Sequence, residues 1–164
     1  MNQATISTLF TSEQCNFAIQ LPAVAPAPKW KESTVTTAAG LVRSVQYLSD
    51  LQTKIWAVSY FEYPQNILKL KSVNQFLDDV AEGSRKAING KVFKVTDFVW
   101  QNKYKAKSVD MVSVDGNQQL YIRADSIMVG TTVYLIVFGS NTSSDLESAE
   151  TNQYYNSFKL LRDL

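Results

Sequence analysis

The stretches IWAVSYFEYP (55–64) and VYLIVFG (133–139) decide the fold of this chain. In the first stretch, apolar side chains occupy both alternating sets of positions, and VYLIVF is apolar without interruption. Alternate side chains of a strand point to opposite faces of its sheet, so both stretches are predicted to be strands that are apolar on both faces. Such strands lie in the middle of a sheet that is covered on both sides.

The clearest predicted helix spans residues 73–88, because its apolar side chains recur at i, i+3, i+4 and i+7 while the opposite side is charged. Ser72 with Gln75 forms a capping-box pattern at its start. Asn89-Gly90 supplies a stop in the left-handed conformation. This segment is therefore expected to cover one face of the sheet.

A second helix is predicted over 145–157, where Ser144 with Glu147 repeats the capping pattern. Asp115-Gly116 is a strong hairpin signal. The remaining predicted strands are a short pair within 7–21, two strands hinged at Gly40 within 33–49, and strands at 54–63, 91–100, 107–114, 117–128 and 132–139.

The predicted elements follow the order strands, helix, strands, helix, and several of the connections are hairpins. We therefore predict an α+β fold: a single domain over residues 1–164, built as an α/β/α sandwich around a mainly antiparallel central sheet. Cys15, which shares a strand face with large apolar residues, is expected to be buried. Trp30, Trp56 and Trp100 are expected to pack in the core.

Composition excludes several classes of protein. The chain has 16 basic and 15 acidic residues and a net charge of +1, so it lacks the concentrated positive field of a nucleic-acid-binding protein. No apolar run approaches the roughly 20 residues that a membrane-spanning helix needs. The first ten residues lack the basic and apolar regions of a leader. We expect a cytoplasmic protein, or a periplasmic or lumenal one if a leader has been removed.

The absence of histidine excludes Ser-His and Cys-His nucleophile activation and histidine-ligated zinc, and a single cysteine cannot form a thiolate zinc site. No two glycines lie closer than seven residues in the sequence, so dinucleotide and phosphate-loop motifs are missing. Asp78 and Glu82 are one helical turn apart, but on the charged face of the predicted helix. We expect no catalytic residue, no metal site and no cofactor, and hence a protein that is not an enzyme.

One candidate partner-binding segment stands out, comprising Lys103, Tyr104, Lys105 and Lys107. Interleaved lysines and an aromatic residue suit docking of an acidic partner protein. The alternative interpretation is a solvated loop or a protected sheet edge, where lysine is common. For Arg123, an interior ion pair and an outward-facing side chain both remain open.

Five segments together resemble the PsbP-like superfamily, which includes the extrinsic photosystem II protein PsbP and bacterial DcrB-type proteins. They are F-x-I-x-L-P (17–22), W-A-V-S-Y-x-x-Y-P (56–64), the helix with Phe76-Leu77-Asp78, V-G-x-x-V-Y-L-I-V (129–137) and N-S-F-K-L-L (156–161). The resemblance covers roughly residues 8–161. It implies the same sandwich fold and a non-enzymatic role in binding or assembly, often outside the cytoplasm.

The leading hypothesis is a non-catalytic accessory or interaction module that binds another protein, or assists assembly of an envelope or photosynthetic membrane complex at its periphery. One alternative is a small-molecule-binding protein, or an enzyme of unrecognised type, with a pocket between sheet and helix. The other is a secretion-associated or toxin-neutralising protein.

Overall fold

The computed structural model describes residues 7–37, 40–115 and 117–163. Most of the chain forms a seven-stranded sheet in which every neighbouring pair is antiparallel. In spatial order, its strands are β3 (Lys29–Thr37), β4 (Gly40–Asp50), β5 (Lys54–Glu62), β9 (Thr132–Ser140), β8 (Gln118–Val129), β7 (Tyr104–Asp115) and β6 (Gly90–Trp100). The mainly antiparallel central sheet predicted from the sequence is confirmed.

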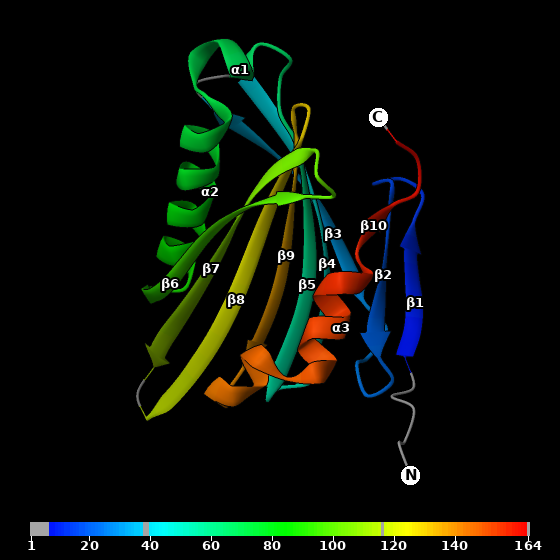
Figure 1. Cartoon of the computed structure of the whole chain (residues 1–164), viewed down its shortest axis with the longest axis vertical. Helices are drawn as coiled ribbons and strands as arrows, with labels where there is room; N and C mark the ends of the chain where they lie inside the picture. Colours follow the sequence, from blue (N-terminus) through cyan, green and yellow to red (C-terminus); the bar gives the residue numbers. More distant parts are fainter. Residues whose placement is uncertain (1–6, 38–39, 116, 164) are drawn as a thin grey trace.

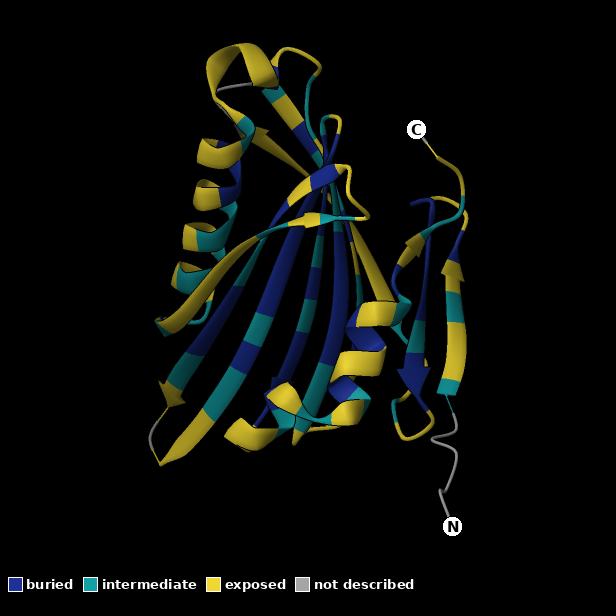
Figure 2. Cartoon of the chain, in the orientation of Figure 1, coloured by how far each residue is buried: buried dark blue, intermediate teal, exposed yellow. Residues whose placement is uncertain are grey.

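The two doubly apolar strands, β5 and β9, pair in the middle of this sheet, with Ala57 opposite Val137. Both faces of β9 are buried, since Val133 packs with the helix layer and Tyr134 packs in the core on the other side. In Figure 2 the central strands are accordingly the darkest part of the sheet. Their predicted position is confirmed.

One face of the sheet carries α1 (Ile67–Leu70) and α2 (Val73–Ala87), and α2 packs on β6, β7 and β8. The capping box is confirmed, because the Gln75 amide donates to Ser72 Oγ at 3.2 Å and the Ser72 amide donates to Gln75 Oε1 at 3.1 Å. Asn89 follows the helix with a left-handed φ of 51°, as expected of its stop signal. The short α1 was not predicted.

The opposite face is covered by a mixed layer, whose strands lie to the right of the sheet in Figure 1 and whose helical segments lie across its lower part. It comprises a small sheet, β1 (Ser7–Ser12), β2 (Phe17–Pro22) and β10 (Lys159–Leu160), together with η1 (Ser143–Glu147) and α3 (Ala149–Ser157). The fully buried Tyr154 of α3 ties the layers together. Its hydroxyl lies 3.1 Å from the carbonyl oxygen of Ala57 and 3.0 Å from that of Val137.

Three sequence-based expectations change. The helical layers of the predicted α/β/α sandwich are not confirmed, because the second layer combines strands with a short helix. The predicted helix 145–157 is broken: a 3-10 turn ends at Glu147, and Ser148, rather than Ser144, caps α3. Trp30 is 61% exposed on the edge strand β3, whereas Trp56 is buried as expected.

The two caps give the first testable prediction. Ser72→Ala and Ser148→Ala should each lower the free energy of unfolding by about 1 kcal/mol, because each removes the acceptor of a helix-terminal amide. Ser144→Ala is the matched control, since no described residue hydrogen-bonds its side chain, and it should leave stability nearly unchanged. Urea unfolding followed by circular dichroism measures all three. An equal loss in Ser144→Ala and Ser148→Ala would contradict the assignment of the cap.

Candidate functional site

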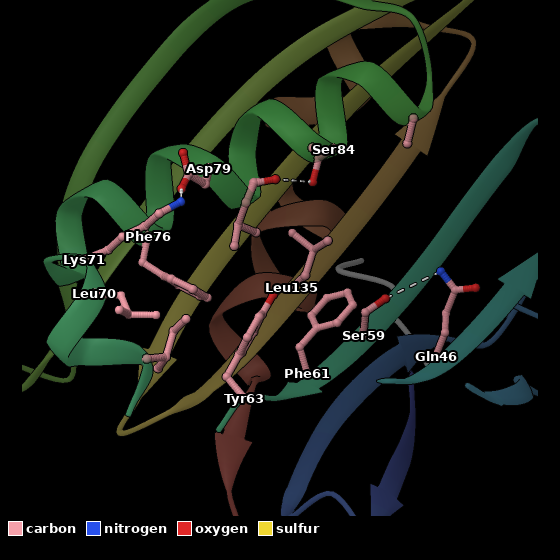
Figure 3. Close-up of a pocket in the computed structure, with 14 residues that line it drawn as sticks. Gln46, Ser59, Phe61, Tyr63, Leu70, Lys71, Phe76, Asp79, Ser84 and Leu135 are labelled. Atoms are coloured by element: carbon pink, nitrogen blue, oxygen red, sulfur yellow. Dashed lines mark hydrogen bonds and ion pairs between the residues drawn. The ribbon is translucent and has the colours of Figure 1, made fainter. Parts of the chain in front are cut away.

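A groove of about 510 Å³ runs between α2 and the part of the sheet that α2 leaves uncovered. Its floor comes from β4, β5 and β9, its wall from α2, and one end from α1 (Figure 3). The residues that line it are Gln46, Ser59, Phe61, Tyr63, Ile67, Leu70, Lys71, Phe76, Asp79, Val80, Gly83, Ser84, Ala87 and Leu135. Most of these side chains present carbon to the groove.

The wall formed by α2 becomes lower toward the C-terminal end of the helix. Phe76 and Val80 stand at the first turns, and Gly83, Ser84 and Ala87 follow on the same flank. A Cβ atom built on Gly83 meets no atom within 4 Å, so the space beside this residue is open. The groove is therefore accessible along α2 rather than closed by large side chains.

Aromatic side chains build the end of the groove next to α1. Tyr63 and Phe76 meet edge to face, with ring centroids 4.5 Å apart, and Phe61 lies next to Tyr63 at 6.4 Å. Burial raises the pKa of Tyr63, so its hydroxyl stays protonated at neutral pH. The aromatic side chains at this end of the groove carry no charge.

Most polar side chains of the groove have a partner within the protein. Lys71 forms an ion pair with Asp79 on the rim, and Gln46 Nε2 donates to Ser59 Oγ at 3.5 Å (Figure 3). Ser84 Oγ donates to the carbonyl of Val80 at 3.0 Å. The lining therefore offers apolar contact area, and its residues include no nucleophile beside a general base.

The predicted partner-binding segment lies at the β6–β7 hairpin. Its side chains do not form one surface, because some are buried and others are exposed. Tyr104 is buried. On the α2 face of the sheet, Lys107 Nζ lies 2.8 Å from Asp78 of α2 and 2.9 Å from Asp97 of β6. Lys103 and Lys105 are exposed, with Lys103 Nζ 5.0 Å from the centre of the Tyr104 ring. Docking at this segment stays a prediction, and only these two lysines present their charge to solvent.

The open question about Arg123 is resolved in favour of an interior ion pair. Its Nε and Nη2 donate to the two carboxylate oxygens of Asp125 at 3.1 and 2.9 Å. The guanidinium stacks on the ring of Tyr155, 3.8 Å from the ring centre. Arg123 therefore belongs to the interface between β8 and α3.

Cys15 is fully buried, as expected, and burial raises the pKa of its thiol. Among residues 7–37, 40–115 and 117–163, no three metal-ligating side chains of the His, Cys, Asp or Glu type gather at one place. None of the helices that the structure describes has the length and apolarity to cross a membrane.

The sequence predicted a pocket between sheet and helix only as an alternative, and none of its lining residues, because the apolar side chains of α2 were all assigned to the core. Phe76 and Leu77 are indeed buried, whereas Gly83 and Ala87 at the end of the helix are exposed. The available signal was the succession of small residues, Gly83, Ser84 and Ala87, on one flank. Small side chains leave room for another element to approach.

Known proteins resemble this chain in structure rather than in sequence. No protein-family model matches it, and no curated protein matches its sequence. The solution structure of cyanobacterial PsbP (CyanoP) from Synechocystis matches with a TM-score of 0.60 and 9% identity, over 97% of this chain and 95% of that one. A Pseudomonas aeruginosa protein of unknown function aligns over 86% of each chain, with 16% identity and a TM-score of 0.40. The likeness to cyanobacterial PsbP supports a PsbP-like fold.

Proposed function

We propose that this protein is a non-catalytic interaction module that binds an apolar helical segment of a partner protein in the groove beside α2. The observation that carries this proposal is the groove itself: a channel lined mainly by carbon, with no net charge, that remains accessible on one side of the sheet. Its rim charges, Lys71 and Asp79, neutralise each other. An apolar occupant can therefore bury apolar surface without leaving a charged side chain unpaired.

The dimensions of the groove favour a helix as the occupant. From Phe76 to Ala87 the wall extends roughly 16 Å at 1.5 Å per residue, which matches about three helical turns. A second helix on a sheet lies roughly 8–10 Å from the first, and small residues on the facing flank permit that spacing. Gly83, Ser84 and Ala87 supply such a flank. Helix-in-groove recognition uses an apolar face of this kind.

Two further observations support an accessory role without catalysis. The lining holds apolar and self-paired polar side chains rather than a reactive set. The fold resembles that of cyanobacterial PsbP, a likeness that is compatible with an accessory protein. We propose that the partner belongs to an envelope or photosynthetic membrane complex, with this protein bound at its periphery in a periplasmic or lumenal compartment.

A small apolar molecule is the second candidate occupant. The groove lies between sheet and helix, where the sequence-based alternative expected a pocket, and its aromatic end is formed by Phe61, Tyr63 and Phe76. A volume of about 510 Å³ lies within the range of small-molecule pockets, roughly 300–1,000 Å³. Decanol as a probe separates the two candidates, because it offers an apolar chain without the backbone or width of a helix.

Gly83→Trp tests the groove. The indole should fill the open space beside Gly83 and weaken binding of a helical peptide at least tenfold, while the helix keeps its stability because tryptophan favours helix more than glycine does. The probe is a fluorescein-labelled amphipathic peptide of about 14 residues with one leucine face, long enough for about four turns. Fluorescence anisotropy measures its affinity.

Lys86→Trp is the matched control, because Lys86 is exposed on the same helix and does not line the groove. A peptide of the same composition with scrambled leucines controls for general stickiness. Equal weakening by both tryptophan variants, or equal binding of both peptides, would refute the helix groove. Thermal stabilisation by decanol without peptide binding would favour the second candidate.

The β6–β7 hairpin yields a separate prediction. Lys103→Glu combined with Lys105→Glu should abolish binding of a fluorescein-labelled glutamate decapeptide at low salt. These two exposed lysines supply the positive charge of the hairpin surface. Lys107 is left intact, since it bridges Asp78 and Asp97. The control pair is Lys31→Glu with Lys91→Glu, two exposed lysines elsewhere with the same charge change. Unchanged decapeptide affinity in the hairpin variant would count against docking there.

A further inference from the structure

A second cavity, of about 460 Å³, lies on the opposite face of the sheet, beneath η1 and the start of α3. Asp110 of β7 lines it and is only 8% exposed. In the sheet register, Asp110 lies between Lys94 of β6 and Arg123 of β8. A carboxylate at this depth normally has a hydrogen-bonding or ion-pairing partner.

Neither neighbouring cation forms an ion pair with Asp110, although both attract its charge from a distance. Arg123 directs Nε and Nη2 to Asp125 and stacks on Tyr155. Lys94 reaches toward η1, where its Nζ lies 3.8 Å from Glu147. No residue in the described part of the chain donates a hydrogen bond to the Asp110 carboxylate or lies within ion-pairing distance of it. The Asp110 carboxylate therefore faces the cavity without a protein donor, and its oxygen atoms are open to the cavity rather than fully buried.

The rest of the cavity suits a donor-rich ligand. Thr96 and Ser108, the next cross-strand pair, contribute hydroxyl groups, and Phe98 contributes an aromatic surface. Glu147 adds a second carboxylate on the η1 side. An alkylammonium group carries three N–H donors and one positive charge, which complements this set of acceptors. An anion would instead meet two carboxylates, while Arg123 is already engaged.

We propose that this cavity binds a small aliphatic amine, whose ammonium group forms an ion pair with Asp110 while its carbon chain lies against Phe98. A second amino group at the far end of a short diamine reaches toward Glu147. The site is distinct from the groove beside α2, because the two lie on opposite faces of the sheet and share no lining residue.

Isothermal titration calorimetry with 1,4-diaminobutane tests the proposal, with 1,4-butanediol as the uncharged analogue. The diamine should bind and the diol should not. Asp110→Asn should weaken diamine binding at least tenfold, whereas Asp115→Asn, the same change at an exposed position of the same strand, should not. Lys94→Met should strengthen binding several-fold, because it removes the cation that competes for Glu147 and stands beside Asp110.

Thermal unfolding as a function of pH gives a second readout. Burial raises the pKa of Asp110 in the folded protein, against opposing effects of Arg123 and Lys94, with Asp125 and Glu147 raising it further. Ionisation of Asp110 therefore costs folding stability as pH rises from the unfolded pKa to the folded pKa. Without ligand, Asp110→Asn should be more stable than wild type at neutral pH, and the two should converge in acid. Added diamine should stabilise the wild type more than Asp110→Asn and so reduce the difference in stability between them at neutral pH.

Absence of diamine binding at millimolar concentration, equal binding of the diol, or undiminished binding by Asp110→Asn would each overturn the proposal. Should Asp110→Asn fail to fold, the wild-type comparison of diamine with diol and the affinity of Lys94→Met decide the question. An affinity unchanged by Lys94→Met would then count against an ammonium site at Asp110.

Discussion

The width of the central sheet, set against the width of a helix, is the constraint on which this structure depends. Seven strands at roughly 4.8 Å spacing make a sheet about 29 Å across, whereas a helix covers about 10 Å. Because β5 and β9 are apolar on both faces, both sides need cover. One side receives α3 and a small sheet; the other receives mainly α2, which lies over β6 to β8. The groove runs along β4, β5 and β9, which α2 leaves uncovered.

The better-covered face is held by tyrosine hydroxyls that donate to backbone carbonyls. Tyr134 reaches the carbonyl of Cys15 at 2.7 Å, Tyr155 that of Arg123 at 2.6 Å, and Tyr154 lies close to two carbonyls of the central strands. These bonds fix α3 and the β1–β2 turn against the sheet. With the layer fixed, Arg123 is enclosed beside Tyr155, and the space under η1 that contains Asp110 remains open.

Patterns local in sequence predicted much of the fold, because periodicity and capping depend on neighbouring residues. The central strands and the cap at Ser72 follow from such patterns. The polar cavity could not be predicted from such patterns, because its residues come together only through the register between strands. Strands at 107–114 and 117–128, as predicted, would pair Asp110 with Tyr121. The observed register pairs Asp115 with Gln118 and so places Arg123 opposite Asp110. The turn residue Gly116 lies outside the described residues, and its hairpin signal did not fix this register.

The alternation of side chains along a strand also explains why the two candidate sites differ in chemistry. On β9, Leu135 faces the groove, while its neighbour Ile136 packs into the core on the other face. The groove face carries carbon and self-paired polar groups, so it favours an apolar partner. Three charged residues of the sheet, Arg123, Asp125 and Asp110, lie on the face that α3 and η1 cover, whereas Lys107 lies on the α2 face beside Asp78 and Asp97. Partial burial strengthens the interaction of a carboxylate such as Asp110 with a bound cation, because less water screens it than at an exposed position. An apolar surface that is left exposed is typical of a site where a partner binds. The less covered α2 face therefore suits an apolar partner, and the more covered α3 face suits a bound cation.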